Sequence, residues 1–139
     1  TPITEGQAHV TEIVNAVMQS SMWDRTAIFL TWDDWGGFYD HVEPPRVDAA
    51  GYGLRVPGLL ISPWADRSLD VDSQTLSFDA YLKLIEDRFL GGQRLDGQSE
   101  GWPDPRPTVR EDVAILGDLR TIFDFEQRPI PKLLLDPRP

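Results

Sequence analysis

The sequence contains no cysteine. This absence excludes disulfide bonds, thiolate-ligated metal sites and catalysis by a cysteine nucleophile. It leaves the cellular compartment open, because a chain without cysteine works at any redox poise. The sequence also lacks any run near the ~18 apolar residues of a membrane-spanning helix, and no charged-then-apolar leader opens it. We therefore expect no transmembrane segment. Because the first residue is not methionine, we also expect a processed or truncated chain.

Basic residues are scarce. The chain has 13 Lys and Arg against 23 Asp and Glu, a net charge of −10 and an isoelectric point near 4.5. This balance excludes nucleic-acid binding by phosphate neutralisation, so we expect no nucleic-acid partner. The same field repels a free phosphate substrate unless a metal ion or a local cationic pocket reverses it.

The 139 residues are enough for one domain, with 40% hydrophobic and 26% charged residues, a globular balance. Thr4 and Gln7 have the spacing of a capping box, which predicts a helix from about Gly6 to Ser21. Ser77 is a good N-cap for a second helix, which Gly91 and Gly92 would end. The apolar residues of the two helices recur at helical spacing: Val10, Ile13, Val14, Val17 and Met18, then Phe78, Tyr81, Leu82, Ile85 and Phe89.

Two short apolar runs predict strands. Residues 26–32 are β-branched and aromatic and apolar on both faces, which favours a buried strand of a parallel sheet. Residues 55–62 form a second strand, in which Pro57 indicates an early or edge position. A further short helix is predicted over residues 115–123.

The predicted fold class is α/β, in the order helix, strand, loop, strand, helix. Seven of the 12 prolines lie in residues 102–107 and 128–139, which predicts extended segments and a proline-rich C-terminal tail. Two strands do not complete a doubly wound domain, so we expect the chain to contribute to a larger sheet.

Two adjacent aspartates, Asp33 and Asp34, directly follow the first predicted strand. Ligands of α/β sheets bind beyond the carboxyl ends of strands. Two carboxylates that close repel each other unless a cation or a proton lies between them. Their hard oxygen atoms suit a divalent metal ion such as Mg²⁺, Mn²⁺, Ca²⁺, Fe or Zn²⁺. Gly36 and Gly37 permit a tight turn that would bring Asp40 and His41 back toward the aspartates.

Other interpretations of this segment remain open. Asp-Asp before Gly-Gly is also ordinary turn composition, and Asp33 would then only cap the next backbone segment. His41 is either a ligand, a general acid or an orienting group, or else a partner in a structural hydrogen bond. We expect His9 to be a solvated surface residue and Arg55 to form a surface salt bridge. The aromatic residues either line an apolar pocket or, by default, pack in the core: Trp32, Trp35 and Phe38.

Three segments together resemble a known family: residues 6–45 (GQAHVTEIVNAVMQSSMWDRTAIFLTWDDWGGFYDHVEPP), 52–72 (YGLRVPGLLISPWADRSLDVD) and 75–92 (TLSFDAYLKLIEDRFLGG). They resemble the C-terminal part of the bacterial phosphoesterase family, which contains non-haemolytic phospholipase C and acid phosphatases within the alkaline-phosphatase superfamily. The resemblance runs over about Ile3 to Phe125. It implies that residues 1–125 are the C-terminal part of a phosphoesterase catalytic domain, an α/β/α sandwich around a mixed sheet, with residues 126–139 as a proline-rich tail.

The resemblance also implies an activity. Members hydrolyse phosphate mono- or diesters, phospholipids among them, through a covalent phosphoryl-enzyme intermediate with the help of a metal. The paired acidic residues that bind this metal correspond to Asp33 and Asp34. Asp40 and His41 would lie near the rim of the active site, with His41 binding or protonating the leaving group. Such relatives are frequently exported, which favours a periplasmic or secreted location.

The chain departs from the family pattern in two ways. The family's Ser or Thr nucleophile and its other metal ligands lie upstream of the residues present here, so we expect the isolated chain to be inactive. Ser73 stands where many relatives carry His, which removes a possible ligand or acid–base group. The alternatives are a non-catalytic metal-binding or interaction module, and a half-domain that needs a separate N-terminal partner.

Overall fold

The computed structural model describes residues 2–94 and 109–138. The chain divides into two compact units. Unit 1 comprises Thr1–Leu30, Gly58–Asp66 and Asp124–Pro139, and unit 2 comprises Thr31–Pro57 and Arg67–Phe123. The predicted extended segment 102–107 lies outside the described residues. The fold class is α/β, as predicted, because the described residues form helices and a small two-stranded sheet.

Unit 1 begins with α1 (Ile3–Gln19), which starts earlier than the sequence predicted. The predicted capping box is wrong, because Thr4 and Gln7 lie inside the helix. The carbonyl of Pro2 starts the ladder instead, accepting from the N–H of Glu5 at 3.1 Å. The predicted apolar face is only partly covered: Met18 is buried, whereas Ile13 is exposed.

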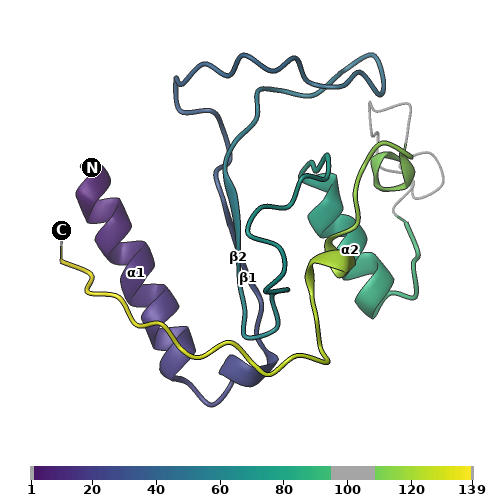
Figure 1. The fold of residues 1–139 in the computed structure, drawn as a ribbon. Helices are drawn as coiled ribbons and strands as arrows, with labels where there is room; N and C mark the ends of the chain where they lie inside the picture. Colours follow the sequence, from purple (N-terminus) through teal and green to yellow (C-terminus); the bar gives the residue numbers. More distant parts are fainter. Residues whose placement is uncertain (1, 95–108, 139) are drawn as a thin grey trace. The chain divides into compact units, whose positions relative to one another are not determined.

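The sheet pairs β1 (Ile28–Thr31) with β2 (Gly58–Ile61). The Ser62 hydroxyl after β2 donates to the carbonyl of Thr26 before β1 at 3.0 Å. At the other end, the Thr31 hydroxyl donates to the Pro57 carbonyl at 2.9 Å. The start of one strand thus meets the end of the other, so the pair is antiparallel (Figure 1). Residues 26–32 were predicted to form a buried strand of a parallel sheet, whereas β1 pairs antiparallel with β2 and is half-buried along its length.

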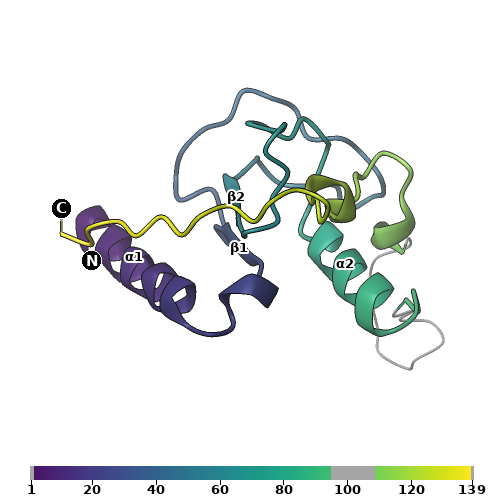
Figure 2. The same ribbon diagram turned by 60° about the horizontal axis from the view of Figure 1, so that its bottom comes forward.

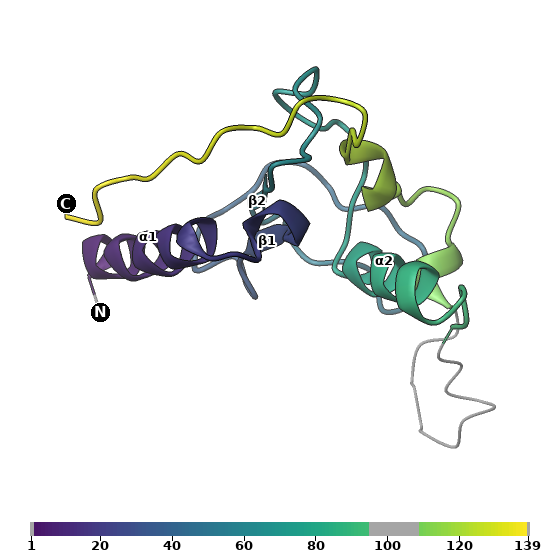
Figure 3. The same ribbon diagram turned by 90° about the horizontal axis from the view of Figure 1, so that it is seen from below.

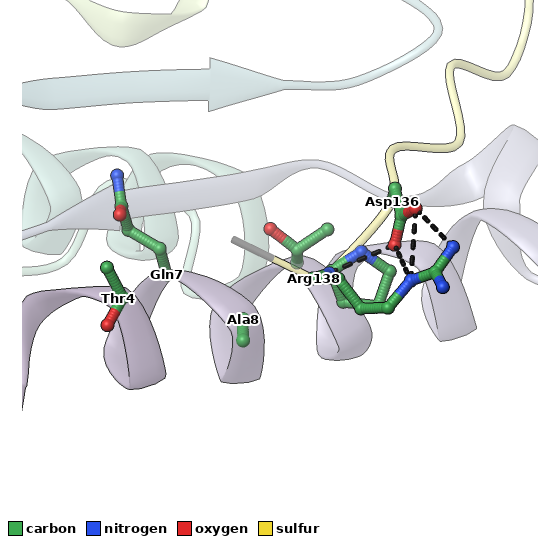
Figure 4. A pocket seen from close by; sticks show the side chains of 7 residues that line it. Thr4, Gln7, Ala8, Asp136 and Arg138 are labelled. Atoms are coloured by element: carbon green, nitrogen blue, oxygen red, sulfur yellow. Dashed lines mark hydrogen bonds and ion pairs between the residues drawn. The ribbon is translucent and has the colours of Figure 1, made fainter.

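The C-terminal segment of unit 1 is extended and lies alongside α1 (Figure 2). The side-chain amide of Asn15 donates to the Leu135 carbonyl at 2.7 Å and accepts from the Leu135 N–H at 3.2 Å. The Asn15 side chain thus satisfies both backbone polar groups of Leu135, as a neighbouring strand would in a sheet, and fixes the segment to α1. An open hollow lies between the helix and the segment (Figure 4), lined by Thr4, Gln7, Ala8, Thr11, Asp136, Pro137 and Arg138. The boundary predicted at residue 126 stays a prediction.

Unit 2 contains α2 (Asp79–Phe89), against which two short 3-10 helices pack, η2 (Arg110–Asp112) and η3 (Leu119–Ile122) (Figure 3). The helix predicted over residues 115–123 is therefore shorter than expected. Leu119 and Ile122 are buried, as is Ala80 of α2. The N-cap position of α2 is Phe78 rather than Ser77, but the Ser77 hydroxyl still accepts from the first helical N–H. No described helix combines the length and apolarity that a bilayer crossing requires.

The apolar face of α2 points to solvent. Four of the five residues predicted on it are roughly half exposed or more: Phe78, Leu82, Ile85 and Phe89 at 48%, 47%, 50% and 74%, whereas Tyr81 is half-buried. The buried side instead carries charged groups, which Arg94 gathers by donating to Asp87 at 2.7 Å and to Glu86 at 3.3 Å. Lys83 and Arg94 hold the pKa of Asp87 below its ordinary value by hydrogen bonding to its carboxylate. The helical period was predicted correctly, but the described residues cover this face only in part.

Gly117 allows two segments of unit 2 to approach closely. Its N–H donates to the Thr75 carbonyl at 2.8 Å, and the next N–H, of Asp118, donates to Oε1 of Gln74 at 2.7 Å. A Cβ at position 117 would lie 2.7 Å from the Cβ of Gln74, closer than side chains tolerate. The contact therefore depends on glycine.

We expect Gly117→Ala to lower the free energy of unfolding by about 1–3 kcal/mol, the usual cost of overpacking. Gly6 is the matched control, because a Cβ there meets nothing within 4 Å on a helix. Gly6→Ala should raise stability by roughly 0.5–1 kcal/mol through helix propensity. Denaturant unfolding measures both, and equal effects of the two substitutions would contradict the close approach.

Candidate active site

Asp33 and Asp34 lie at the start of the long connection from β1 to β2, and both are exposed. The Asp34 carboxylate accepts a hydrogen bond from the Gly36 N–H, the pattern of an aspartate that stabilises a turn. Asp33 makes no hydrogen bond or ion pair to any other residue that the structure describes. The turn role that the sequence left open is thus filled by Asp34, while Asp33 is free to bind a ligand.

Gly36 and Gly37 form the tight turn that the sequence predicted. The Phe38 N–H donates to the Trp35 carbonyl at 2.9 Å, which closes a four-residue turn. The two glycines have φ of 59° and 84°, the left-handed values that define a type I′ turn. Side chains at these positions would be strained, so glycine is required here.

Asp40 is held by Arg55. The guanidinium donates from Nε to Oδ2 at 2.6 Å and from Nη2 to Oδ1 at 2.9 Å. This bidentate pair keeps the pKa of Asp40 well below the usual range of a carboxyl group. Asp40 is therefore ionised at neutral pH and acts as an acceptor. The prediction that Arg55 forms a salt bridge is confirmed.

His41 is almost fully exposed, with 85% of its side chain accessible. Its Nδ1 lies 3.8 Å from Oδ1 of Asp40, beyond hydrogen-bond distance. The same Asp40 oxygen accepts from the N–H of Val42 at 3.2 Å. The structure thus brings Asp40 and His41 together and leaves the imidazole accessible to a ligand. His9 is exposed, as predicted.

The Asp33–Asp34 pair and the Asp40–His41 pair do not converge. Within residues 2–94 and 109–138, no three side chains of His, Asp or Glu lie close enough to hold one metal ion. Asp33 and Asp34 therefore provide two neighbouring oxygen donors but no complete donor set. The turn at Gly36 and Gly37 does not bring Asp40 and His41 into one group with them.

Three aromatic side chains near the start of the connection are exposed, so the expectation that they pack in the core is wrong. Trp32, Trp35 and Phe38 are 47%, 51% and 77% accessible. The physical reason is that, within residues 2–94 and 109–138, the sheet has only two strands and does not enclose these side chains. Ser73 is also exposed.

Sequence reasoning missed a buried polar cluster in unit 2. Arg110 donates to both carboxylate oxygens of Asp48 at 2.8 and 2.7 Å, and Tyr52 donates to Asp79 at 3.2 Å. The Asp48–Gly51 spacing is a local turn signal, and the N–H of Gly51 does donate to Asp48 at 3.1 Å. Arg110 itself carried no signal, because its partner lies 62 residues away.

Comparisons with known proteins match the part of the chain that carries the candidate site. A model of the phosphoesterase family matches residues 1–90. The chain is 33% identical to the non-hemolytic phospholipase C of Burkholderia pseudomallei (strain K96243), over 89% of this chain and 20% of the relative. It is 29% identical to phospholipase C A of Mycobacterium tuberculosis (strain ATCC 25618 / H37Rv), over 92% of this chain and 27% of that relative. It is 35% identical to non-specific phospholipase C6 of Arabidopsis thaliana, over 47% of this chain and 16% of that relative.

The chain thus spans about a quarter or less of the length of these curated relatives. The family match covers most of the chain, including β1, the acidic connection, β2 and α2. These relatives are phosphoric ester hydrolases by name. The chain belongs to the phosphoesterase family.

Proposed function

We propose that this chain is the part of a phosphate-ester hydrolase that supplies two carboxylate ligands, Asp33 and Asp34, to a catalytic divalent metal ion. The observation that carries the proposal is the free, exposed carboxylate of Asp33 beside Asp34, at the end of β1 and inside the family match. The names of the relatives favour a phospholipid as substrate, in a phospholipase C-like reaction, with acid phosphatase-like cleavage of monoesters as the alternative.

The donor chemistry fits such an ion in part. Carboxylate oxygens are preferred by hard cations such as Ca²⁺ and Mn²⁺, and Zn²⁺ or Fe also accept them. Asp33 offers both oxygens, and Asp34 retains the oxygen that does not accept from Gly36. The remaining ligands must come from water, substrate or residues beyond those described. When bound, the ion neutralises phosphoryl charge and lowers the pKa of a nucleophile, which lets so acidic a chain meet an anionic substrate.

Asp40 and His41 have separable roles in this proposal. Asp40, kept ionised by Arg55, does not donate a proton near neutral pH. It serves as a fixed negative charge 3.8 Å from the imidazole, suited to orient a protonated His41. The exposed ring of His41 is then the group that binds or protonates the leaving group.

The chain works as part of a larger enzyme. Its relatives are about four or more times longer than the matched portion, and much of the apolar face of α2 lies uncovered. Among the described residues the sheet has only two strands, fewer than a complete domain of this class contains. These features favour a half-domain that is completed by an N-terminal portion carrying the nucleophile. The isolated chain is then inactive.

The metal site predicts weak but specific binding. We expect the purified chain to bind Mn²⁺ or Ca²⁺ with a dissociation constant on the order of 10⁻⁴–10⁻³ M, as expected for a site with few protein ligands. Asp33→Asn/Asp34→Asn should weaken binding at least tenfold. Glu12→Gln/Asp70→Asn removes the same charge at exposed positions elsewhere and should leave it unchanged. Calorimetric titration of each variant with Mn²⁺ or Ca²⁺ measures these dissociation constants.

Equal affinities in the two double variants would show that the carboxylate pair is not the site. A chromogenic phosphate ester tests the second half of the proposal. Robust metal-dependent turnover by the isolated chain would contradict its dependence on an N-terminal portion, while leaving the metal site intact.

The Asp40–Arg55 pair predicts a pH dependence. Arg55→Gln should raise the pKa of Asp40 toward the ordinary value of about 3.9, because the bidentate donor is lost. Since the folded-state pKa is depressed, the pair stabilises the protein above pH ~4 and loses this effect as pH falls toward the folded-state value. Carboxyl NMR titration measures the shift. Arg46→Gln, at an exposed arginine of the same connection, should leave the pKa of Asp40 low; a similar rise there would refute the specific pair.

A further inference from the structure

The connection between β1 and β2 carries the whole proposed site yet contains no helix or strand of its own. Its order must therefore come from side-chain bonds. Two of these close it on itself: Thr31 bonds to Pro57 at the base, and Arg55 bonds to Asp40 further in. The Arg55–Asp40 bond thus closes a loop over residues 41–54. The middle of this loop lies far along the chain from both bonds, so a further interaction must hold it in place.

Arg110 of η2 supplies that tie. It is only 9% exposed. Its Nη2 donates to Oδ1 of Asp48 at 2.7 Å and to the Gly51 carbonyl at 2.8 Å, while Nε donates to Oδ2 of Asp48 at 2.8 Å. Asp48 in turn accepts from the N–H of Ala50 at 2.9 Å. One guanidinium therefore fixes a carboxylate and a backbone carbonyl of the same turn.

Tyr52 extends the tie to α2. The guanidinium carbon of Arg110 lies 4.5 Å from the centre of its ring, a cation–π distance. The Tyr52 hydroxyl donates to Oδ2 of Asp79, the first residue of α2, which also accepts from Ser77. Burial and the neighbouring carboxylate raise the pKa of Tyr52, so the phenol stays a donor. The middle of the connection is thereby attached to both η2 and α2.

We infer that Arg110 is a positioning residue for the proposed site: it anchors the connection that carries Asp33, Asp34, Asp40 and His41 to η2 and α2. The inference rests on the proposed function for the identity of the site. It gives a role to a residue beyond the family match, which ends at residue 90. Arg110 contacts no reacting group; it acts through Asp48 and Tyr52.

The planar fork of arginine is essential to this arrangement. Three N–H groups point at once to two carboxylate oxygens and a carbonyl while the face of the group lies over Tyr52. Lysine carries the same charge but cannot make this set of directed bonds. Arg110→Lys and Arg110→Gln therefore separate charge from geometry.

The test compares these variants with Arg94→Gln in the same chain. Arg94 is a suitable control because it is also largely buried and paired with carboxylates of unit 2, but bonds to α2 and Asp112 instead of the connection. Amide NMR reports on Gly36 and Gly37, beside the aspartate pair, and hydrogen exchange reports on Ala50 and Gly51. Both measurements work without metal.

We expect Arg110→Gln to speed exchange at Ala50 and Gly51 at least tenfold and to shift or broaden the Gly36 and Gly37 amides. Arg110→Lys should recover part of both effects, and Arg94→Gln should cause neither. Mn²⁺ affinity should fall at least threefold in Arg110→Gln alone. If Arg110→Gln unfolds the chain, the comparison rests on Arg110→Lys, which keeps the charge.

Unchanged Gly36 and Gly37 amides in folded Arg110→Gln or Arg110→Lys would overturn the positioning role. The same effects in Arg94→Gln would also overturn it, because Arg110 would then serve only general stability. Absence of Mn²⁺ binding by the unsubstituted chain is a separate result: it removes the proposed metal site, while the amide measurements still decide whether Arg110 positions the connection.

Discussion

Paired guanidinium and carboxylate groups order unit 2 where apolar packing is sparse. Arg110 with Asp48 and Arg55 with Asp40 are both bidentate, the geometry in which such pairs are strongest and most directional. A long connection without regular structure loses much conformational entropy when it is ordered. These directed bonds, together with the turns that Asp34 and Asp48 stabilise, offset that loss at fixed points along it.

The distribution of apolar residues follows from the same arrangement. The buried apolar side chains of unit 2 include Ala80, Leu119 and Ile122, where α2 meets η3, while much of the apolar face of α2 remains accessible, as do the aromatic side chains Trp32, Trp35 and Phe38 of the connection. Amphipathic helices normally turn their apolar face inward. Here the inward face carries the charges that Arg94 gathers. This reversal is the strongest physical support for a larger domain in which the exposed face is covered.

Local patterns in the sequence predicted the elements but not their surroundings. The 3.6-residue period located α1 and α2, and Pro57 correctly placed the start of β2. Strand direction was missed because a short apolar run has the same pattern in parallel and antiparallel pairs. The exposure of Trp35 was missed because burial depends on neighbours that the local sequence does not contain. The tight turn at Gly36 and Gly37 was predictable, since only glycine takes two consecutive left-handed conformations at low cost.

The candidate site was predicted only as far as adjacent residues allow. Asp33 and Asp34 were recognised from their place after a strand, and the role of Arg55 from its type. The partner of Arg110 could not be predicted, because pairing across 62 residues depends on the fold and leaves no local period.

Charge pairing finally separates the aspartates into two groups. Asp40, Asp48 and Asp87 each bond to arginine, and their negative charge is already compensated. Asp33 and Asp34 have no Lys or Arg partner among the residues that the structure describes, and they stand next to each other in a chain of net charge −10. Their mutual repulsion is therefore uncompensated within the described part of the chain. The binding free energy of a divalent cation would be more favourable at Asp33 and Asp34 than at the paired aspartates, because at a paired aspartate the cation would have to displace an arginine.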